Sequence, residues 1–359
     1  MRYFSITILI ILTLISCNSQ TNKKMESDYT ISTASESDER AKKALPFEGK
    51  EDKSDILKLN ISVPNYPEEP DSIKYFANTK YDWIITIEAN HSNLFHRDSV
   101  EKYISNDWRK KVMYPTVYCL PEKSNNWRYL YAGDNEANTF KKIALAWMLY
   151  DPIEESPTIY DERTLSKFDN LVKKRIKKIK ADKIEYNYSI QEASSVSNGL
   201  SDFVTKNNQW AIIVLKADNK FDGKEIWDVM MSLGLRWGDM DLFHWNNSDL
   251  EFGDDQLLSV WTSTAPEYFF PEEIAAGNVK TEDLIFGFSI PRSVAPQEVF
   301  KVMCEVTDYA QKRLGGEILD GNGNKLDKNT ELDRIDLILK NLDKESINSG
   351  IGDALYLFQ

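Results

Sequence analysis

The sequence predicts a fold that mixes β-strands with α-helices in two tandem units, because one order of elements occurs twice along the chain. That order is a strand, a helix, further strands, a long helix and a last strand, and the two copies are about 130 residues apart. A chain of 359 residues fits two domains plus tails. Its 42% hydrophobic and 12% aromatic residues are enough to build packed interiors.

The first unit is expected at residues 75–200. The run WIITIEAN, from Trp83, is typical of a strand, and a helix follows around residues 98–105. Residues 145–152 (LAWMLYDP) predict a strand that ends in a proline, which cannot donate a hydrogen bond to a neighbouring strand. A strand at residues 183–189 (KIEYNYS) closes the unit. Before it, a long helix has one apolar face, made of Leu165, Phe168, Leu171, Val172, Ile176 and Ile179.

The second unit is expected at residues 205–345 and repeats this pattern. The run WAIIVLKAD, from Trp210, predicts a strand, and residues 223–233 predict the helix after it. Residues 284–291 (LIFGFSIP) match the earlier strand that ends in proline, and EILD (317–320) predicts the last strand. The long helix between them has an apolar face made of Val299, Phe300, Met303, Cys304 and Ala310.

Four blocks of the second unit resemble, in order, the C-terminal FtsZ-binding domain of the ZipA family. They are GLRWGDMDLFH (234–244), LLSV (257–260), LIFGFSIP (284–291) and LGGEILD (314–320). The resemblance implies an α+β fold with a mostly antiparallel sheet, helices packed on one face and the other face open. In ZipA that open apolar face receives the C-terminal peptide of FtsZ, so the resemblance implies a protein or peptide partner. The first unit would be a degenerate second copy.

The resemblance also implies which residues form the binding face. Met240 keeps a contact methionine of the family, whereas Gly287 stands where the family has phenylalanine and Ser263 where it has methionine. Large apolar anchors usually carry most of a peptide's binding energy, so the face is expected to be poorer in anchors than that of the family. The carried-over positions are Ala211, Met240, Leu242, Ser263, Ala265, Ile285, Gly287 and Ser289.

Residues 1–16 predict a signal peptide. Arg2 supplies a positive charge, and residues 4–15 form an apolar run that is shorter than the about 20 residues that span a bilayer core. The run ends in LISC, which looks like a lipobox whose cysteine, Cys17, becomes the lipid-modified first residue. We therefore expect a membrane-anchored lipoprotein of the cell envelope, on the periplasmic or surface side. The alternative is an uncleaved signal anchor.

Residues 17–70 are polar and predict a lipidated, disordered tether with a reach of roughly 40 Å. Residues 346–359 are expected to form a C-terminal tail. FtsZ is cytoplasmic, whereas a lipidated Cys17 would place the folded part beyond the inner membrane. A division-associated binding protein is therefore one hypothesis. The alternative is an envelope lipoprotein that uses the same scaffold for an unrelated extracytoplasmic partner or a structural role.

The sequence offers no catalytic constellation, so we expect neither an enzyme nor a cofactor. A net charge of −13 argues against nucleic-acid binding, which needs a basic surface. His244 is expected to be structural, and a metal pair of His91 and His96 is the less favoured reading of that loop. Asp239 and Asp241 would share one face of a strand and meet solvent there.

Residues 320–331 (DGNGNKLDKNTE) have oxygen ligands at several positions of a calcium loop. Lys325 stands where the sharp turn of that loop needs glycine, and Asn322-Gly323 favours a hairpin instead. No metal site is therefore expected. Cys119 and Cys304 are expected to be buried free thiols, with a disulfide between the two units as the alternative.

Overall fold

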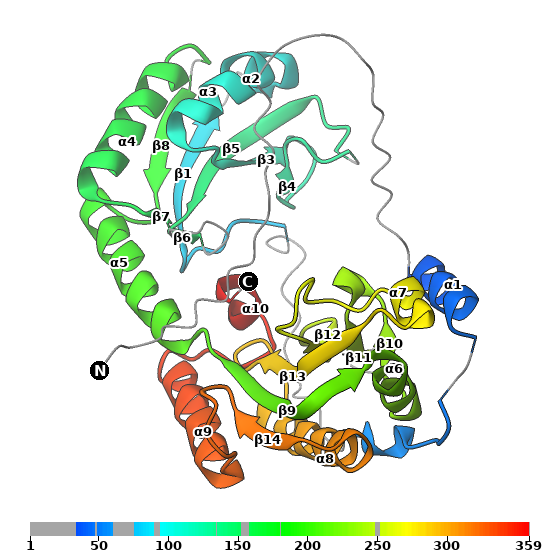
Figure 1. Ribbon diagram of the computed structural model, residues 1–359. Coiled ribbons are helices and arrows are strands. Elements are labelled where there is room, and N and C mark those ends of the chain that lie inside the picture. The colour runs from blue at the N-terminus through cyan, green and yellow to red at the C-terminus, as the bar shows by residue number, and fades with distance from the viewer. Residues whose placement is uncertain are drawn as a thin grey trace.

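The computed structural model describes residues 34–46, 49–59, 75–89, 94–133, 135–151, 158–179, 181–247 and 252–358. The predicted signal peptide, Cys17 and His91 lie outside the described residues. Two antiparallel sheets, each with its own helices, lie side by side as two units (Figure 1). This architecture confirms the α+β fold class.

The first sheet has the strand order β4-β3-β5-β1-β8, and β2 pairs with β5. Its strands are β1 (Asp82–Ala89), β2 (Phe95–His96), β3 (Thr116–Pro121), β4 (Arg128–Tyr129), β5 (Thr139–Met148) and β8 (Ala181–Tyr186). A separate small sheet pairs β6 (Tyr150–Asp151) with β7 (Thr158–Ile159). The helical elements are α2 (Arg97–Tyr103), α3 (Asn106–Arg109), η2 (Lys110–Val112), α4 (Glu162–Ile176) and α5 (Ile190–Asn207).

Alternate residues of β1 face the core of this unit. Trp83 lies opposite Trp147 of β5, and the ring of Trp147 stacks on Phe168 of α4, with 5.9 Å between the ring centroids. The apolar face predicted for α4 therefore packs on the sheet. Asp161 caps this helix by accepting a hydrogen bond from the N–H group of Thr164.

The second sheet has the strand order β10-β11-β12-β13-β9-β14, with antiparallel pairing throughout. Its strands are β9 (Trp210–Asp222), β10 (Arg236–Trp237), β11 (Phe243–Asn246), β12 (Gln256–Trp261), β13 (Lys280–Ser289) and β14 (Glu317–Asp320). The helices are α6 (Gly223–Ser232), α7 (Pro271–Ala276), α8 (Pro296–Leu314) and α9 (Lys328–Lys344), and η3 (Asp239–Asp241) is a 3-10 turn. The sheet buries Leu215, Leu284 and Phe286 on the face that α6 and α8 cover.

Gly315 and Gly316 join α8 to β14 with φ values of +80° and +89°. A side chain at Gly316 would collide with the carbonyl oxygen of Lys216 in β9, so glycine lets the two backbones approach here. Gly315 is the C-cap of α8, so the helix ends at this pair of glycines.

The two sheets share part of their topology. The order β3-β5-β1-β8 in the first corresponds to β12-β13-β9-β14 in the second. The strand next to this shared part differs in its place along the chain. In the first sheet β4 comes after its neighbour β3 in sequence, whereas in the second sheet β11 comes before its neighbour β12. Trp83 points into the core and Trp210 points outward, so the two tryptophans that suggested the repeat are not equivalent. A duplication stays a proposal.

The expectation of a disordered tether is wrong for residues 34–46 and 49–59. Helix α1 (Ala34–Ala44) packs against α7 and β10, and the N–H group of Lys53, just before η1 (Ser54–Ile56), donates to the carbonyl of Ser232. Arg40 forms ion pairs with Glu272 at 2.8 Å and with Asp241 at 3.2 Å. Charged contacts of this kind hold the segment, and a hydropathy pattern cannot predict them.

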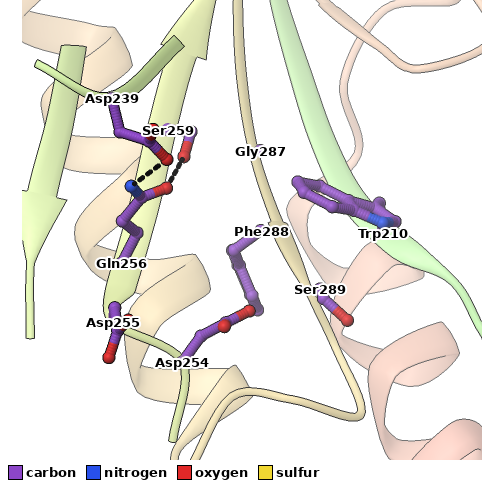
Figure 2. A pocket seen from close by; sticks show the side chains of 9 residues that line it. All are labelled: Trp210, Asp239, Asp254, Asp255, Gln256, Ser259, Gly287, Phe288 and Ser289. Carbon is purple, nitrogen blue, oxygen red and sulfur yellow. Dashed lines mark hydrogen bonds between the residues drawn. The ribbon is translucent and has the colours of Figure 1, made fainter. Parts of the chain in front are cut away.

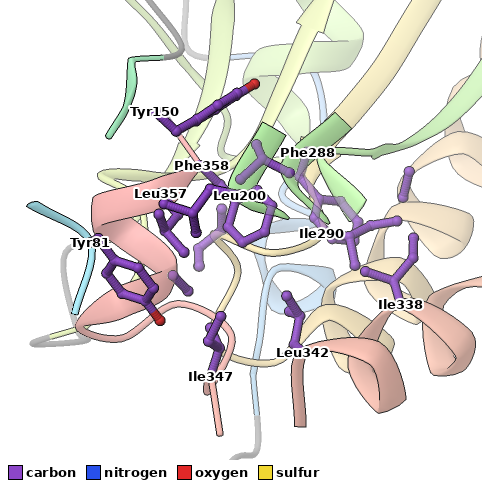
Figure 3. Packing of buried hydrophobic residues seen from close by; sticks show 14 of the residues in the cluster. Tyr81, Tyr150, Leu200, Phe288, Ile290, Ile338, Leu342, Ile347, Leu357 and Phe358 are labelled. Carbon is purple, nitrogen blue, oxygen red and sulfur yellow. The ribbon is translucent and has the colours of Figure 1, made fainter. Parts of the chain in front are cut away.

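The expectation of a C-terminal tail is also wrong. Residues 347–358 include α10 (Asp353–Leu357), and Leu357 and Phe358 are fully buried. This segment lies between the two units, where the hydroxyl group of Tyr81 in the first unit donates a hydrogen bond to the carboxylate of Asp353. The apolar cluster around it contains Tyr150 and Leu200 from the first unit and Ile338 from the second (Figure 3).

Candidate functional site

The open face of the second sheet is made by the outward residues of β9, β13 and β12. On β9 these residues are Trp210, Ile212 and Val214, and they lie opposite Ser289, Gly287 and Ile285 of β13. The aliphatic members are half-buried, and Trp210 is 45% exposed. The face thus presents apolar side chains to solvent.

Ala211 does not belong to this face, so its assignment as a contact residue is wrong. It is fully buried opposite Phe288, on the side that the helices cover. Successive side chains of a strand point to opposite faces, and pairing with β13 sets which ones point inward.

The ring of Trp261 covers Gly287, the position at which the resemblance implies a phenylalanine in the family. Trp261 lies at the end of β12, and a Cβ atom added to Gly287 would stand only 2.6 Å from its Cη2 atom. Trp210 meets this ring edge-on, with 6.1 Å between the ring centroids. An aromatic pair from β9 and β12 therefore replaces an anchor on β13, and the face is richer in anchors than expected. The period of two in LLSVW could have shown that Trp261 shares the face of Ser259.

A hollow of about 170 Å³ opens beside this pair. Figure 2 shows Asp239, Gln256 and Ser259 on one side of it and Trp210 on the other, across the strand that carries Gly287. A second hollow of about 330 Å³ continues from it and shares Trp210, Asp254 and Ser289. The full lining of the two is Asn208, Trp210, Asp239, Asp254, Asp255, Gln256, Ser259, Gly287, Phe288, Ser289 and Arg292.

His244 fixes one wall of the first hollow. Its Nε2 atom lies 2.8 Å from the carbonyl oxygen of Asp239, and its Nδ1 atom lies 2.9 Å from the hydroxyl oxygen of Ser259. Burial lowers the pKa of His244, so the ring is neutral near pH 7. A carbonyl only accepts, and Nε2–H is therefore the donor. This is the structural role expected for His244.

The remaining predicted contact residues are spread around the open face. Met240 is 66% exposed at the tip of η3, where its φ of 54° is left-handed, and Leu242 follows it half-buried. Ser263 and Ala265 lie beyond β12, in the loop that leads to α7, where the Ser263 hydroxyl donates to Asp283.

Asp239 and Asp241 lie on the turn η3 and not on a strand, so they do not share a face. Asp241 points to Arg40, whereas Asp239 lines the hollow. Left-handed backbone at Met240 and Asp241 breaks the alternation on which the prediction depended.

The chain at residues 319–325 forms the short hairpin predicted at Asn322-Gly323. Leu319 forms an antiparallel bridge with Lys325, and the N–H group of Asp320 donates to the carbonyl of Asn324. The Asp320 carboxylate accepts hydrogen bonds from the N–H groups of Asn322 and Asn324, and Asp327 caps α9 directly after the hairpin. Over the described ranges, no group of three potential metal ligands occurs, and no helix is long and apolar enough to cross a membrane.

Both predicted free thiols are confirmed, since Cys119 and Cys304 are buried and unpaired. Burial raises the pKa of Cys304 to about 11, so this thiol is protonated and unreactive at neutral pH. His96 ends β2, and its proposed partner His91 lies outside the described residues.

The corresponding face of the first sheet is covered by its own chain. Phe76, which precedes β1, and Trp127 pack against a buried cluster that includes Tyr118 of β3 and Ala144 of β5. The rings of Phe76 and Trp127 are stacked, with 4.4 Å between their centroids. Among the described residues, the open apolar sheet face is therefore a feature of the second unit and not of the first.

Comparison with known proteins finds a family match for the second unit. Residues 210–335 match the family described as ZipA, C-terminal FtsZ-binding domain. The predicted resemblance is thereby confirmed for this ZipA-like domain. The first unit lies outside the matched residues.

Curated relatives match the same part of the chain. The cell division protein ZipA of Shewanella loihica is 28% identical over 109 residues, which are 30% of this chain and 32% of the relative. The ZipA proteins of Marinobacter nauticus and Vibrio cholerae are 27% and 29% identical, over 31% and 36% of their lengths. The chain thus spans about a third of the curated relatives that it matches.

Proposed function

We propose that this chain is a non-enzymatic, membrane-anchored scaffold whose ZipA-like domain binds a segment of a partner protein on its open sheet face. The observation that carries the proposal is the aromatic pair of Trp210 and Trp261 above Gly287, on the face that the family uses for its ligand. Aromatic anchors in a shallow apolar surface are typical of peptide recognition. Resemblance to ZipA makes the C-terminal segment of FtsZ the first partner to test, and a division-associated role follows from it.

A photo-crosslinking amino acid at Met240 tests this function in living cells. Met240 is 66% exposed beside the open face, whereas Ile159, 47% exposed on β7 of the first unit, is an apolar control outside the ZipA-like domain. An FtsZ adduct from position 240 and none from position 159 would support the division role. Adducts of equal yield from both positions would contradict it.

An extracytoplasmic partner is the second candidate function, and the lipobox-like LISC segment favours it. In this case Cys17 carries the lipid, and the ZipA-like domain meets an envelope protein and not FtsZ. Substitution Cys17→Ala should abolish lipid labelling and release the protein from membranes. Retention in the membrane without label would favour an uncleaved anchor and a cytoplasmic partner.

A further inference from the structure

We propose that the open face of the second unit selects a partner segment in which a lysine or arginine lies next to a large apolar side chain. This inference rests on the proposed use of that face for binding and names the chemistry of the ligand. The apolar side chain would pack on Trp210 and Trp261, and the cationic group would enter the adjoining acidic hollow.

The charge of the lining residues favours a cationic ligand. Among the residues that the structure describes, three carboxylates line the two joined hollows, those of Asp239, Asp254 and Asp255, and Arg292 is the one cation. Arg292 is already engaged in a two-pronged ion pair with Asp254, at 2.8 and 2.9 Å. The charge of Arg292 also acts on Asp255, but one cation against three carboxylates leaves the lining with a net negative charge, which attracts a cationic group.

The carboxylates of Asp239 and Asp255 have few partners within the described part of the protein. One oxygen of Asp239 accepts a hydrogen bond of 3.3 Å from Gln256. The Asp255 carboxylate forms no hydrogen bond or ion pair with any residue in the described part of the chain. A lysine or arginine at this place would gain charge-assisted hydrogen bonds without breaking an existing ion pair.

The floor of the same site also contains a hydroxyl group without a partner. Ser289 is only 5% exposed, lines both hollows, and its Oγ atom has no hydrogen-bond partner among the described residues. A buried hydroxyl without a partner costs free energy, which a ligand can recover by supplying a donor or an acceptor. Because the Oγ atom itself is enclosed, a peptide backbone or a basic side chain would supply this group once the Ser289 side chain turns toward the hollow.

The geometry places the apolar and acidic parts within reach of one peptide. Trp210 lines both hollows and also contacts Trp261, so the aromatic pair borders the acidic rim directly. Figure 2 shows Trp210 and the acidic residues on opposite sides of Gly287 and Ser289. An extended segment that crosses β13 would therefore meet both parts with side chains a few residues apart.

Selection from a library of random nine-residue peptides displayed on phage tests this inference, with the full chain in mild detergent as the target. We expect enriched peptides to combine lysine or arginine with phenylalanine, tryptophan, leucine or isoleucine. Enrichment should disappear with the variant Asp239→Asn/Asp255→Asn. It should persist with Asp182→Asn/Asp218→Asn, which removes the same two charges from exposed positions of β8 and β9. Enriched peptides without a basic residue, or no enrichment above background, would overturn the inference.

Titration of the most enriched peptide makes the test quantitative. Replacing its basic residue with glutamine should weaken binding at least tenfold to the natural chain and should have little effect on Asp239→Asn/Asp255→Asn. Binding should also weaken as salt rises, because the charges are partly exposed. If the FtsZ peptide binds through Trp261 while no basic preference emerges, the inference falls and the proposed function stands. If basic peptides bind and the FtsZ peptide does not, only the division role falls.

Discussion

The hydroxyl group of Tyr356 in α10 donates a hydrogen bond to the carboxylate of Asp82 in β1, across the boundary between the two units. Burial raises the pKa of Asp82 to about 6, although the hydrogen bonds from Tyr356 and Asn78 act in the opposite direction. The contact between the units thus contains an acid whose proton is held more tightly in the folded protein than in the unfolded chain.

This relationship predicts a dependence of stability on pH. Between about pH 4 and pH 6 the folded state binds more protons at Asp82 than the unfolded state, so stability falls as pH rises through this window. In Asp82→Asn this contribution is absent. The melting temperature of the natural chain minus that of the variant should therefore decrease from pH 4.5 to pH 7. Asp182→Asn, at an exposed position of β8, is the control and should show no such decrease. A melting-temperature difference between the natural chain and Asp82→Asn that stays constant or grows with pH would contradict the prediction.

Gly287 and Trp261 should be energetically coupled. Gly287→Phe restores the aromatic residue of the family but collides with the ring of Trp261, so we expect a loss of about 1–3 kcal/mol in unfolding free energy. Trp261→Ala removes this collision, so the same change should cost less, although the carbonyl oxygen of Ala211 stays close, 3.2 Å from the added Cβ atom. Urea unfolding of the four chains measures the coupling, and strictly additive effects would show that the two positions do not share the space.

Arg40 should hold α1 on the ZipA-like domain. Its guanidinium group binds Glu272 through two hydrogen bonds of 2.8 Å and lies 5.1 Å from the ring centroid of Trp237. Because Arg40 is partly exposed, Arg40→Ala should cost only about 1 kcal/mol, yet it should loosen α1 locally. Trypsin should then cleave faster after Lys42 and Lys43. Lys301→Ala, which breaks an exposed ion pair on α8, should leave that rate unchanged, and equal rates in all three chains would refute the role of Arg40.

Much of the fold could be predicted from local patterns. The alternation in β9 and β13 and the apolar stripes of α4 and α8 depend on neighbours in sequence, and the structure places all four elements where they were expected. Helices α1 and α10 were missed because they are short, and their stability depends on contacts with distant residues such as Glu272 and Asp82.

The binding face was harder to predict than the fold. Ile285, Gly287 and Ser289 lie together on the open face, as the alternation of β13 implies, and their part in binding stays a prediction. Ala211 was placed wrongly, since its face depends on the register between two strands that are far apart in sequence. Asp255 and the free hydroxyl of Ser289 become meaningful only once β12 and β13 lie side by side, which no single motif reveals.

Titration of the C-terminal peptide of FtsZ from the same organism tests the central claim most directly. The targets are the full chain, Trp261→Ala, and Leu337→Ala as a control on α9. We predict saturable binding in the micromolar range to the natural chain and to Leu337→Ala, and binding at least tenfold weaker to Trp261→Ala, because an aromatic anchor is lost. No saturable binding to a folded chain, or an affinity that Trp261→Ala leaves unchanged, would contradict the claim that this face binds the FtsZ segment.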